Sequence, residues 1–535
     1  MPGHKGFRNL PKLERMKRGH PAPAAPPTPR RAPRPPRPRP APRPRPVVLG
    51  DFPPAHRMLL LALAELLGPS GEAFVVGGAV RDLLLSREVV EDLDLTVPSG
   101  ALATGRSLAS RLGGAFVALD ERRGAARVVV RVGTEDRRVD LTDFRAPTLE
   151  ADLQARDFSV NAIAVPLVPL VRAGKAQPVD PTGGLDDLAR RRLRLAGPRA
   201  LEEDPLRALR GVRLAIELGL ALDAPARSAA RRVAPQIASI SAERIRDEVA
   251  RLLALPRASH GLGELDRLGL LEAILPEIAP MKATPQPKPH RFSVWEHSLK
   301  TVEAVERLLG HLGSLAPYGD ELAAHVAEPL GDGLTRGHLL KLAALLHDVA
   351  KPQTRRVFEG RVRFIGHDLE GAQVVRAIGR RLRLSGRAID ALERLVRHHL
   401  RPMHLGQVGE ISRRARYRFF RDLGAEARDL LLLTLADSAA VRGNSPLAVW
   451  RGPGGRLVAD LMRGWAEDRS RVMVPPLLTG DDVMAAFGLR PGPAVGRLLR
   501  LAREAQDLGI VGTREQALAY LRRAHERLDT PEAPN

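Results

Sequence analysis

The chain has 535 residues, no cysteine and a formal net charge of +22 at pH 7. This length is too great for one ordinary domain, and the missing thiols exclude disulfides, thiolate zinc sites and cysteine nucleophiles. Hydrophobic residues make up 44% of the chain but aromatic residues only 3%, so we expect a helix-rich core of Leu, Ala and Val. We expect neither a membrane span nor a signal peptide, and a cytoplasmic location. The sequence leaves the oligomeric state open.

Residues 1–50 carry more than half of the excess positive charge. They contain 13 Lys or Arg residues against one acid, Glu14, and positions 21–46 are almost entirely Pro, Arg and Ala. Such a composition cannot bury enough apolar surface to form a core. We therefore expect a disordered basic tail, which either holds RNA loosely through its phosphates or is a solvated segment without a dedicated role.

Residues 51–180 are predicted to form a small unit of strands and helices. Apolar periodicity predicts three helices, at Leu59–Leu67, Ala79–Leu85 and Leu102–Leu112. Alternating or continuous apolar runs predict five strands, at Ala73–Val76, Leu93–Val97, Phe116–Leu119, Val128–Val132 and Arg138–Asp143.

Beyond about residue 185, strand signals fade and helical periodicity takes over, as in Pro205–Leu218, Ala242–Leu255 and Leu339–Val349. Pro and Gly clusters near 280–289 and 452–455 mark joints between helical modules. We expect an α+β chain in which a head with a mixed sheet precedes all-helical modules. The expected modules cover residues 181–285, 286–445 and 446–535.

Two carboxylates stand out in the predicted strand around residues 92–97. Strict alternation sends its apolar residues into the core and places Asp92, Asp94 and Thr96 together on the other face. The two aspartates then lie about 7 Å apart at their backbones, near enough to share Mg²⁺. Asp140 is the best candidate for a third acid, and Asp143 is a weaker one. The pattern fits two-metal phosphoryl transfer, although Asp-x-Asp alone is more often typical of a polar surface than of a metal site.

A glycine pair precedes these acids, between the strand at 73–76 and the next helix. Gly77 and Gly78 would let backbone N–H groups approach phosphate oxygens at the helix N-terminus, with Arg81 as a counter-charge. A glycine pair by itself also fits an ordinary strand-to-helix turn. Followed at this distance by Asp92 and Asp94, it predicts a nucleotide site.

With these motifs the chain resembles the tRNA nucleotidyltransferase and bacterial poly(A) polymerase family, the class II branch of the polymerase-β-like superfamily. The resemblance runs from about Phe74 to the C-terminal region. It implies a polymerase-β-like head that uses Mg²⁺ at Asp92 and Asp94, CTP and ATP as substrates, and tRNA as the partner. The nearest alternative is a poly(A) polymerase acting on other RNAs.

Two further blocks carry the resemblance. Residues 156–162 are similar to the family's RRDFTxNA block, which implies that Arg156, Asp157 and Asn161 help to bind the sugar and phosphates of the nucleotide. Ala155 stands where the family has its first arginine, and this loss weakens a phosphate contact. Ser159 stands in place of the family's threonine.

Residues 203–207 are similar to the family's EDxxR element, which implies that Asp204 and Arg207 select the incoming base. A carboxylate accepts from an exocyclic amine and a guanidinium donates to ring or carbonyl acceptors, so C or A can be chosen without a nucleic-acid template. Arg210 and Arg213 continue the same helix face and could reach phosphate. Without the resemblance, a helix-surface ion pair explains the pattern as well.

Only ten residues separate Arg145 from Arg156. Family members that build the whole CCA end carry a longer flexible loop there, which is tied to switching from C to A. The short segment therefore resembles enzymes that add only the two cytidines.

A second constellation consists of His297, His347, Asp348 and Asp437. This order resembles the HD superfamily of metal-dependent phosphohydrolases and implies a divalent transition metal or Mg²⁺ held from separate helices. His367 and the pair His398 and His399 are further candidates for the same pocket or for a second metal. The resemblance implies hydrolysis of 2′,3′-cyclic phosphates, and an alternative of another class is an HD phosphohydrolase with an idle head.

Overall fold

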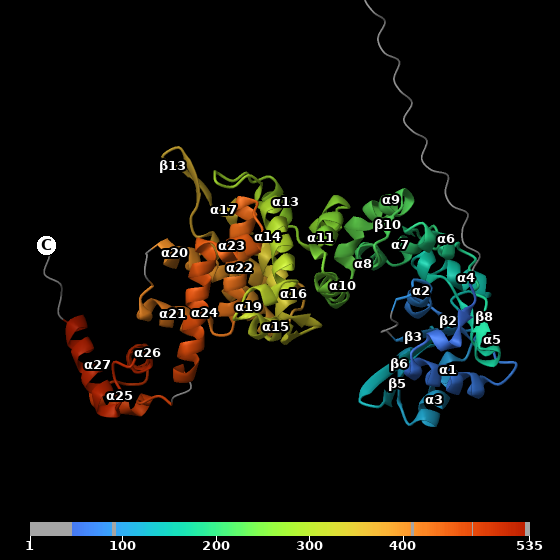
Figure 1. The fold of residues 1–535 in the computed structure, drawn as a ribbon, viewed down its shortest axis with the longest axis horizontal. Coiled ribbons are helices and arrows are strands. Elements are labelled where there is room, and N and C mark those ends of the chain that lie inside the picture. Colours follow the sequence, from blue (N-terminus) through green and yellow to red (C-terminus); the bar gives the residue numbers. More distant parts are fainter. Residues whose placement is uncertain (1–44, 88–91, 408–410, 473–474, 530–535) are drawn as a thin grey trace, which may run out of the picture. The chain divides into compact units, whose positions relative to one another are not determined.

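A computed structural model describes residues 45–87, 92–407, 411–472 and 475–529 (Figure 1). The predicted basic tail lies outside the described residues, apart from its last six positions. The head begins before the predicted tail boundary at residue 50. Strand β1 (Val47–Val48) pairs with β8 (Lys175–Ala176), and Val47 is buried. The sequence could not indicate this pairing, since the partner strand lies far along the chain.

The head is built on a six-stranded sheet in the order β4-β5-β6-β3-β2-β7. Strands β3 and β6 run parallel and the other neighbours run antiparallel, so the predicted mixed sheet is confirmed. The five predicted strands are confirmed with small shifts of their ends. The strands are β2 (Phe74–Val76), β3 (Leu93–Val97), β4 (Ala115–Asp120), β5 (Ala125–Val132), β6 (Glu135–Asp143) and β7 (Val165–Pro166).

Apolar side chains cover both faces of this sheet. On one face, Leu95 and its neighbours join a core with helices α1 (Pro54–Leu67) and α3 (Ala101–Leu112). On the other face, the side chains of Phe74 and Val76 pack against α4 (Leu149–Gln154). Thr96 lies on this second face and is fully buried; its hydroxyl donates to the carbonyl of Thr142 at 3.2 Å. The acid-bearing face is therefore covered at Phe74, Val76 and Thr96, whereas Val117 on the same face of β4 is exposed.

A run of helices follows the head: α7 (Ala200–Glu203), α8 (Leu206–Leu218), α9 (Ala224–Val233), α10 (Ala242–Ala254), α11 (Ala258–Arg267), α12 (Leu270–Ile274) and α13 (Ile278–Lys282). Helix α8 lies against the head at Gly211, where a β-carbon would come within 2.5 Å of the Phe158 ring. Only glycine permits this close approach.

The central part of the chain is built around the long buried helix α22 (Glu426–Arg442), which packs against α14, α16 and α19. Helix α14 begins with a capping box between Ser293 and Glu296, the arrangement that favours helix initiation there. The helices are α14 (Val294–Leu309), α15 (Gly319–Ala327), α16 (Arg336–Leu346), α17 (Lys351–Thr354), α18 (His367–Arg381), α19 (Gly386–His398), α20 (Arg401–Gln407) and α21 (Arg413–Leu423).

A β-hairpin interrupts these helices and corrects the all-helical prediction for this part. It consists of β13 (Arg355–Phe358) and β14 (Arg361–Phe364). Glu359 and Gly360 have φ values of +50° and +71°, as a two-residue turn with left-handed positions requires. The alternation of residues 355–364 around Glu-Gly was the available signal, but helical periodicity on both sides concealed it.

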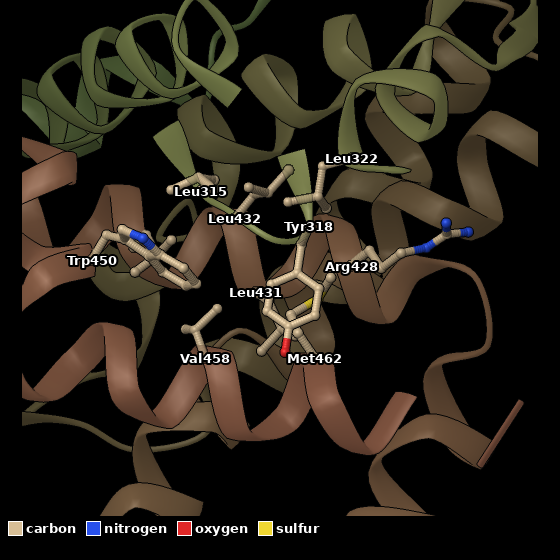
Figure 2. A pocket seen from close by; sticks show the side chains of 10 residues that line it. Leu315, Tyr318, Leu322, Arg428, Leu431, Leu432, Trp450, Val458 and Met462 are labelled. Atoms are coloured by element: carbon tan, nitrogen blue, oxygen red, sulfur yellow. The ribbon is translucent and has the colours of Figure 1, made fainter. Parts of the chain in front are cut away.

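The remaining helices are α23 (Pro446–Arg451), α24 (Pro453–Val472), α25 (Gly480–Phe487), α26 (Pro493–Asp507) and α27 (Arg514–Asp529). Glu504 of α26 accepts hydrogen bonds from Arg414, Arg418 and Arg421 of α21. Beside α22, Leu, Trp and Tyr side chains line a cavity of about 10 Å³ (Figure 2). This space holds about one water molecule at most, so it is a packing gap and no substrate site.

The helical modules behind a mixed-sheet head confirm the predicted α+β fold class. Across the residues that the structure describes, the longest apolar helices fall short of what a membrane crossing would require.

Candidate functional site

The glycine turn and Asp94 lie in direct contact. Val76, the last residue of β2, pairs with Asp94 of β3, and Gly77 follows with a φ of +76° at the start of α2 (Gly78–Leu84). A β-carbon at Gly77 would lie 2.7 Å from Asp94 Oδ2, so a larger residue would collide with the carboxylate. The positive φ disfavours side-chain-bearing residues as well. The juxtaposition predicted from the two motifs is therefore present.

A row of charged residues crosses the sheet at this level. Asp94 of β3 stands beside Asp140 of β6, which stands beside Arg127 of β5. Arg127 donates to both oxygens of Asp140, at 2.8 and 2.7 Å. This hydrogen-bonded pair raises the pKa of Arg127, with further contributions from the charges of Asp92 and Asp94. Arg127 was missed from the sequence, although it alternates onto the acidic face.

The four predicted acids thus have different surroundings. Asp92 directly precedes β3, and its Oδ2 lies 3.6 Å from a guanidinium nitrogen of Arg138. Asp140 is engaged with Arg127. Asp143 accepts a hydrogen bond from the backbone N–H of Ala101 at 2.7 Å, so it caps the N-terminus of α3. Asp92 and Asp94 therefore offer the oxygen ligands that suit Mg²⁺, whereas Asp143 has a structural contact.

A chain of hydrogen bonds joins the glycine turn to helix α8. Arg81, which is 4% exposed, donates to Asn161 Oδ1 at 2.8 Å. Asn161 Nδ2 donates to Asp157 Oδ1 at 3.2 Å, and Asp157 Oδ2 accepts from Arg210 at 3.4 Å. Four of the residues predicted to bind the nucleotide thus form one network, which reaches the helix that carries Arg207.

The network is anchored by buried charges. Burial alone would raise the pKa of Asp157, but the charge of Arg210 and hydrogen bonds from the Phe158 N–H and Asn161 hold this pKa below its ordinary value. Glu248 of α10 accepts from Arg210 and from Arg213, at 3.4 and 2.9 Å. The predicted phosphate contacts of Arg210 and Arg213 thus compete with carboxylates that already hold these side chains.

Three guanidinium groups gather beside this network. Burial lowers the pKa of Arg145, and the charges of Arg156 and Arg207 lower it further. Arg156 is 9% exposed; it donates to Asp152 at 3.2 Å, while its Nε has no hydrogen-bond partner. Crowded cations, of which Arg156 is buried with an unpaired donor, fit an anionic ligand such as a triphosphate. Arg145 was not among the predicted site residues.

The side chains of the two predicted base-selecting residues bind different partners, although the Arg207 N–H donates to the Asp204 carbonyl at 3.0 Å. Asp204 precedes α8, accepts from the Leu206 N–H at 3.3 Å and pairs with Arg244 at 2.7 Å. Arg207 donates to the carbonyls of Ala155 and Ala200, at 3.3 and 3.1 Å. Both side chains stand at the N-terminal end of α8, where the hydrogen-bond chain from the glycine turn arrives.

The histidine constellation converges as the sequence suggested. Two groups of three ligands, each with its donor atoms within 4.8 Å of one another, come together from α14, α18, α22 and the ends of α16 and α19. The groups are His297, His347 and Asp437, and Asp348, His367 and His399.

Asp348 lies between the two groups. Its Oδ2 is 3.2 Å from His347 Nε2, and its Oδ1 is 3.4 Å from His367 Nε2. Burial would raise the pKa of Asp348, but His347 and Lys351 hold it well below its ordinary range. His297 Nε2 lies 3.0 Å from Asp437 Oδ1, so the buried ring nitrogens of His297 and His347 each face a carboxylate oxygen. Buried imidazole nitrogens and carboxylate oxygens that converge in this way fit a divalent cation.

The structure differs from the prediction at His398. Its neighbour His399 belongs to the ligand group, and His399 Nε2 lies 3.1 Å from His367 Nε2. Burial and the charge of His347 lower the pKa of His399 to about 4, so this ring is neutral and able to bind a metal. His398 instead lies beside Arg401, which together with burial lowers its pKa.

Two residues near these groups were missed. His290 stacks edge-on against His297 with ring centroids 5.1 Å apart, and burial lowers its pKa to about 4. Gln286 accepts a hydrogen bond from Lys351 at 2.8 Å, and Lys351 lies 2.7 Å from Asp348 Oδ2. Neither residue carries a sequence motif.

Comparison with known proteins identifies three domain families in this chain. The Poly A polymerase head domain matches residues 73–194, the probable RNA and SrmB-binding site of polymerase A matches residues 208–282, and the HD domain matches residues 294–438. The matches therefore cover the head, the helices that follow it and the part that holds the histidine groups.

Full-length relatives are also found. An A-adding tRNA nucleotidyltransferase of Deinococcus radiodurans is 38% identical over 470 residues, which cover 86% of this chain and 97% of the relative. A CC-adding tRNA nucleotidyltransferase of Thermus thermophilus is 38% identical over 461 residues, covering 84% of this chain and 93% of the relative. A solved structure of the Thermotoga maritima CCA-adding enzyme complexed with tRNA has a TM-score of 0.56 at 16% identity over 89% of this chain and 97% of that one, a likeness of fold.

Proposed function

We propose that this chain, which belongs to the tRNA nucleotidyltransferase family, adds nucleotides to the 3′ end of tRNA without a nucleic-acid template. CTP or ATP is the proposed nucleotide substrate, and the tRNA 3′ hydroxyl is the acceptor. The observation that carries this proposal is the contact of Asp94 with Gly77, joined by the Arg81–Asn161–Asp157 network to helix α8. A cysteine-free enzyme acting on tRNA fits the cytoplasm.

In the proposed mechanism, Asp92 and Asp94 hold Mg²⁺. When bound, this ion supplies the charge that activates the attacking hydroxyl and holds the triphosphate. The backbone N–H groups at Gly77 and Gly78 approach phosphate oxygens at the N-terminus of α2. The guanidinium groups of Arg145 and Arg156 neutralise the triphosphate. The tRNA 3′ hydroxyl attacks the α-phosphate, and pyrophosphate leaves.

Asp204 and Arg207 are proposed to select the base. The Asp204 carboxylate accepts from the exocyclic amine that C and A share, and Arg207 donates to a ring nitrogen or carbonyl. For this, Asp204 must release Arg244 and Arg207 must turn from the carbonyls that it now contacts. Arg244 is half-exposed, so the exchange costs little.

We further propose that the chain adds C. The two relatives named above are equally similar at 38% identity, so overall similarity does not separate C addition from A addition. The segment between Arg145 and Arg156 is short and forms helix α4, capped by Thr148, rather than a long loop. This supports the restricted activity that the short segment suggested.

The test uses tRNA transcripts that end at the discriminator base and transcripts that end in CC, each with CTP alone, ATP alone or both. Product lengths are measured at single-nucleotide resolution. Two added cytidines and no adenosine support C addition, whereas one A added only to the CC transcript identifies A addition. Long A tails on unrelated RNA would contradict the tRNA assignment and favour a poly(A) polymerase.

A second activity is proposed for the histidine groups. Two ligand sets that meet at Asp348 suit a pair of divalent cations, and a histidine-rich set favours transition metals over Mg²⁺. Divalent cations held by these residues would supply the charge that activates water for hydrolysis of a phosphate ester. We propose 2′,3′-cyclic phosphates at RNA ends as its substrates. Opening of the cyclic phosphate on such RNA to a phosphomonoester end, with the metal content of the protein measured by mass spectrometry, tests this. A protein that carries metal but leaves the cyclic phosphate intact would overturn it.

A further inference from the structure

The hairpin formed by β13, which Figure 1 labels, and β14 has two faces that the pairing register makes chemically different. The pairing register places Val357 opposite Val362 and Arg355 opposite Phe364, and these four residues share one face. On the other face, Arg356 stands opposite Arg363 and Phe358 opposite Arg361. We call Arg356, Phe358, Arg361 and Arg363 the basic hairpin face.

This basic face is exposed and lacks acidic partners. Phe358 is 59% exposed, although a phenyl ring gains free energy from burial. Within the described ranges of the chain, none of the three arginines on this face lies within 4 Å of a carboxylate. Guanidinium groups without carboxylate partners around an exposed aromatic ring are complementary to a chain of phosphates and bases.

The base of the hairpin is attached to the histidine groups. The hairpin connects α17, which begins at Lys351, with α18, which begins at His367. Lys351 lies 2.7 Å from Asp348 Oδ2 and 5.5 Å from the Phe364 ring centroid. The Phe364 carbonyl is 2.6 Å from His367 Nδ1. The base of the hairpin therefore adjoins the residues of the histidine groups.

We propose that the basic hairpin face binds single-stranded RNA and guides its 3′-terminal phosphate to the histidine groups. The four residue pairs span about 13 Å, enough for a few nucleotides. Phe358 stacks on a base, and the arginines contact the flanking phosphates, which requires no particular sequence. The guiding role rests on the proposed phosphohydrolase activity, whereas the binding itself does not.

The binding test compares the full-length protein with three variants. F358A removes the stacking ring, R356Q/R361Q/R363Q removes the charges, and R355Q is the matched control on the opposite face. The probe is a fluorescent ten-nucleotide single-stranded RNA with a 3′ hydroxyl, followed by anisotropy. F358A should weaken binding about 10-fold. Each lost phosphate contact lowers the slope of log affinity against log salt concentration by about 0.7. The triple variant should therefore lower this slope by about 2, and R355Q by at most about 0.7.

The hydrolysis test separates guidance from catalysis. Two substrates are used: a mononucleotide 2′,3′-cyclic phosphate and a ten-nucleotide RNA that ends in the same group. In both hairpin variants KM for the RNA should rise about 10-fold, while kcat/KM for the mononucleotide stays unchanged. The mononucleotide reports only on the metal centre, so a hairpin that merely supports His367 would impair both substrates.

The remaining outcomes distinguish failure of the phosphohydrolase proposal from failure of RNA binding by the hairpin. If the unmodified protein hydrolyses neither substrate, the phosphohydrolase proposal fails, while the anisotropy still decides whether the hairpin binds RNA. Unchanged RNA affinity in both hairpin variants overturns the inference. Equal loss with R355Q overturns it too. A change of oligomeric state in sedimentation without a change in RNA affinity would assign this face to a second copy of the chain.

Discussion

In the head, Asp92 and Asp94 stand two residues apart on one strand, whereas the histidine groups draw their ligands from positions 297 to 437. The head aspartates lie at a partly open end of a sheet, opposite permanently charged arginines. The histidine ligands are buried among helices and are held largely by one another. One pair of ligands thus arises from local strand geometry, while the other set exists only once five helices have packed.

This difference predicts that the two sites fail independently. Asp92 and Asp94 stand on the sheet of the head, whose hydrophobic core is separate from the core around α22 beside the histidine groups. Mutations at widely separated sites usually have additive effects. Four experiments test whether the two sites are independent and how each is held in place.

Replacing both head aspartates should have the largest effect. In D92A/D94A, nucleotide addition to tRNA should fall by about 10³-fold or more, because the charge that stabilises the transferring phosphoryl group is lost. The rate of hydrolysis of a 2′,3′-cyclic mononucleotide should change by no more than a factor of about 2 relative to the unmodified protein. Retained nucleotide addition in this variant would contradict the mechanism and favour an idle head.

The neighbouring histidines provide a matched pair for the second site. H399A should lose bound metal and about 10-fold or more of the hydrolytic activity, because His399 is one of the six ligands. H398A should keep its metal, since His398 lies outside both groups. Metal content is measured by inductively coupled plasma mass spectrometry. Equal metal loss in the two variants would show that disturbance of the end of α19, and not removal of a ligand, causes the loss.

A pair of glycine substitutions tests how α8 is held against the head. G211A should lower the free energy of unfolding by about 1–3 kcal/mol, because its β-carbon would collide with the Phe158 ring. In G386A the new methyl group meets nothing within 4 Å at the first turn of α19, so stability should be unchanged or slightly higher. Thermal unfolding followed by circular dichroism measures both. A stable G211A with full activity would show that this contact does not position α8.

The smallest effect is expected from the pH dependence of Asp157. Its pKa is lowered from the ordinary value of 3.8, so its ion pair with Arg210 adds stability above that pH. This stability is lost as the pH falls through the lowered pKa. At pH 7, D157N should be less stable than the unmodified protein by about 1–2 kcal/mol. Denaturant titrations from pH 7 to pH 3 should show the gap shrinking below pH 3.8; a constant gap would exclude the charge as its cause.

Local patterns determined much of the head and of its candidate site. Alternation in residues 93–97 is enough to predict both the strand and the face on which Asp94 stands, because side chains in a strand point to opposite sides in turn. The glycines at 77 and 78 predict a sharp turn for the same local reason, because the positive φ of Gly77 would cost other residues free energy. The helices α8 and α10 likewise follow from apolar periodicity within the segment.

Tertiary structure alone decided which charged groups meet. Adjacent helix residues differ in direction by about 100°, so only the packing of α19 determines that His399 and not His398 joins the ligands. The pairing of Asp140 with Arg127 depends on the order of strands in the sheet, and Asp143 became a helix cap because α3 begins beside it. These contacts join residues that are distant in sequence, and no periodicity within a segment encodes them.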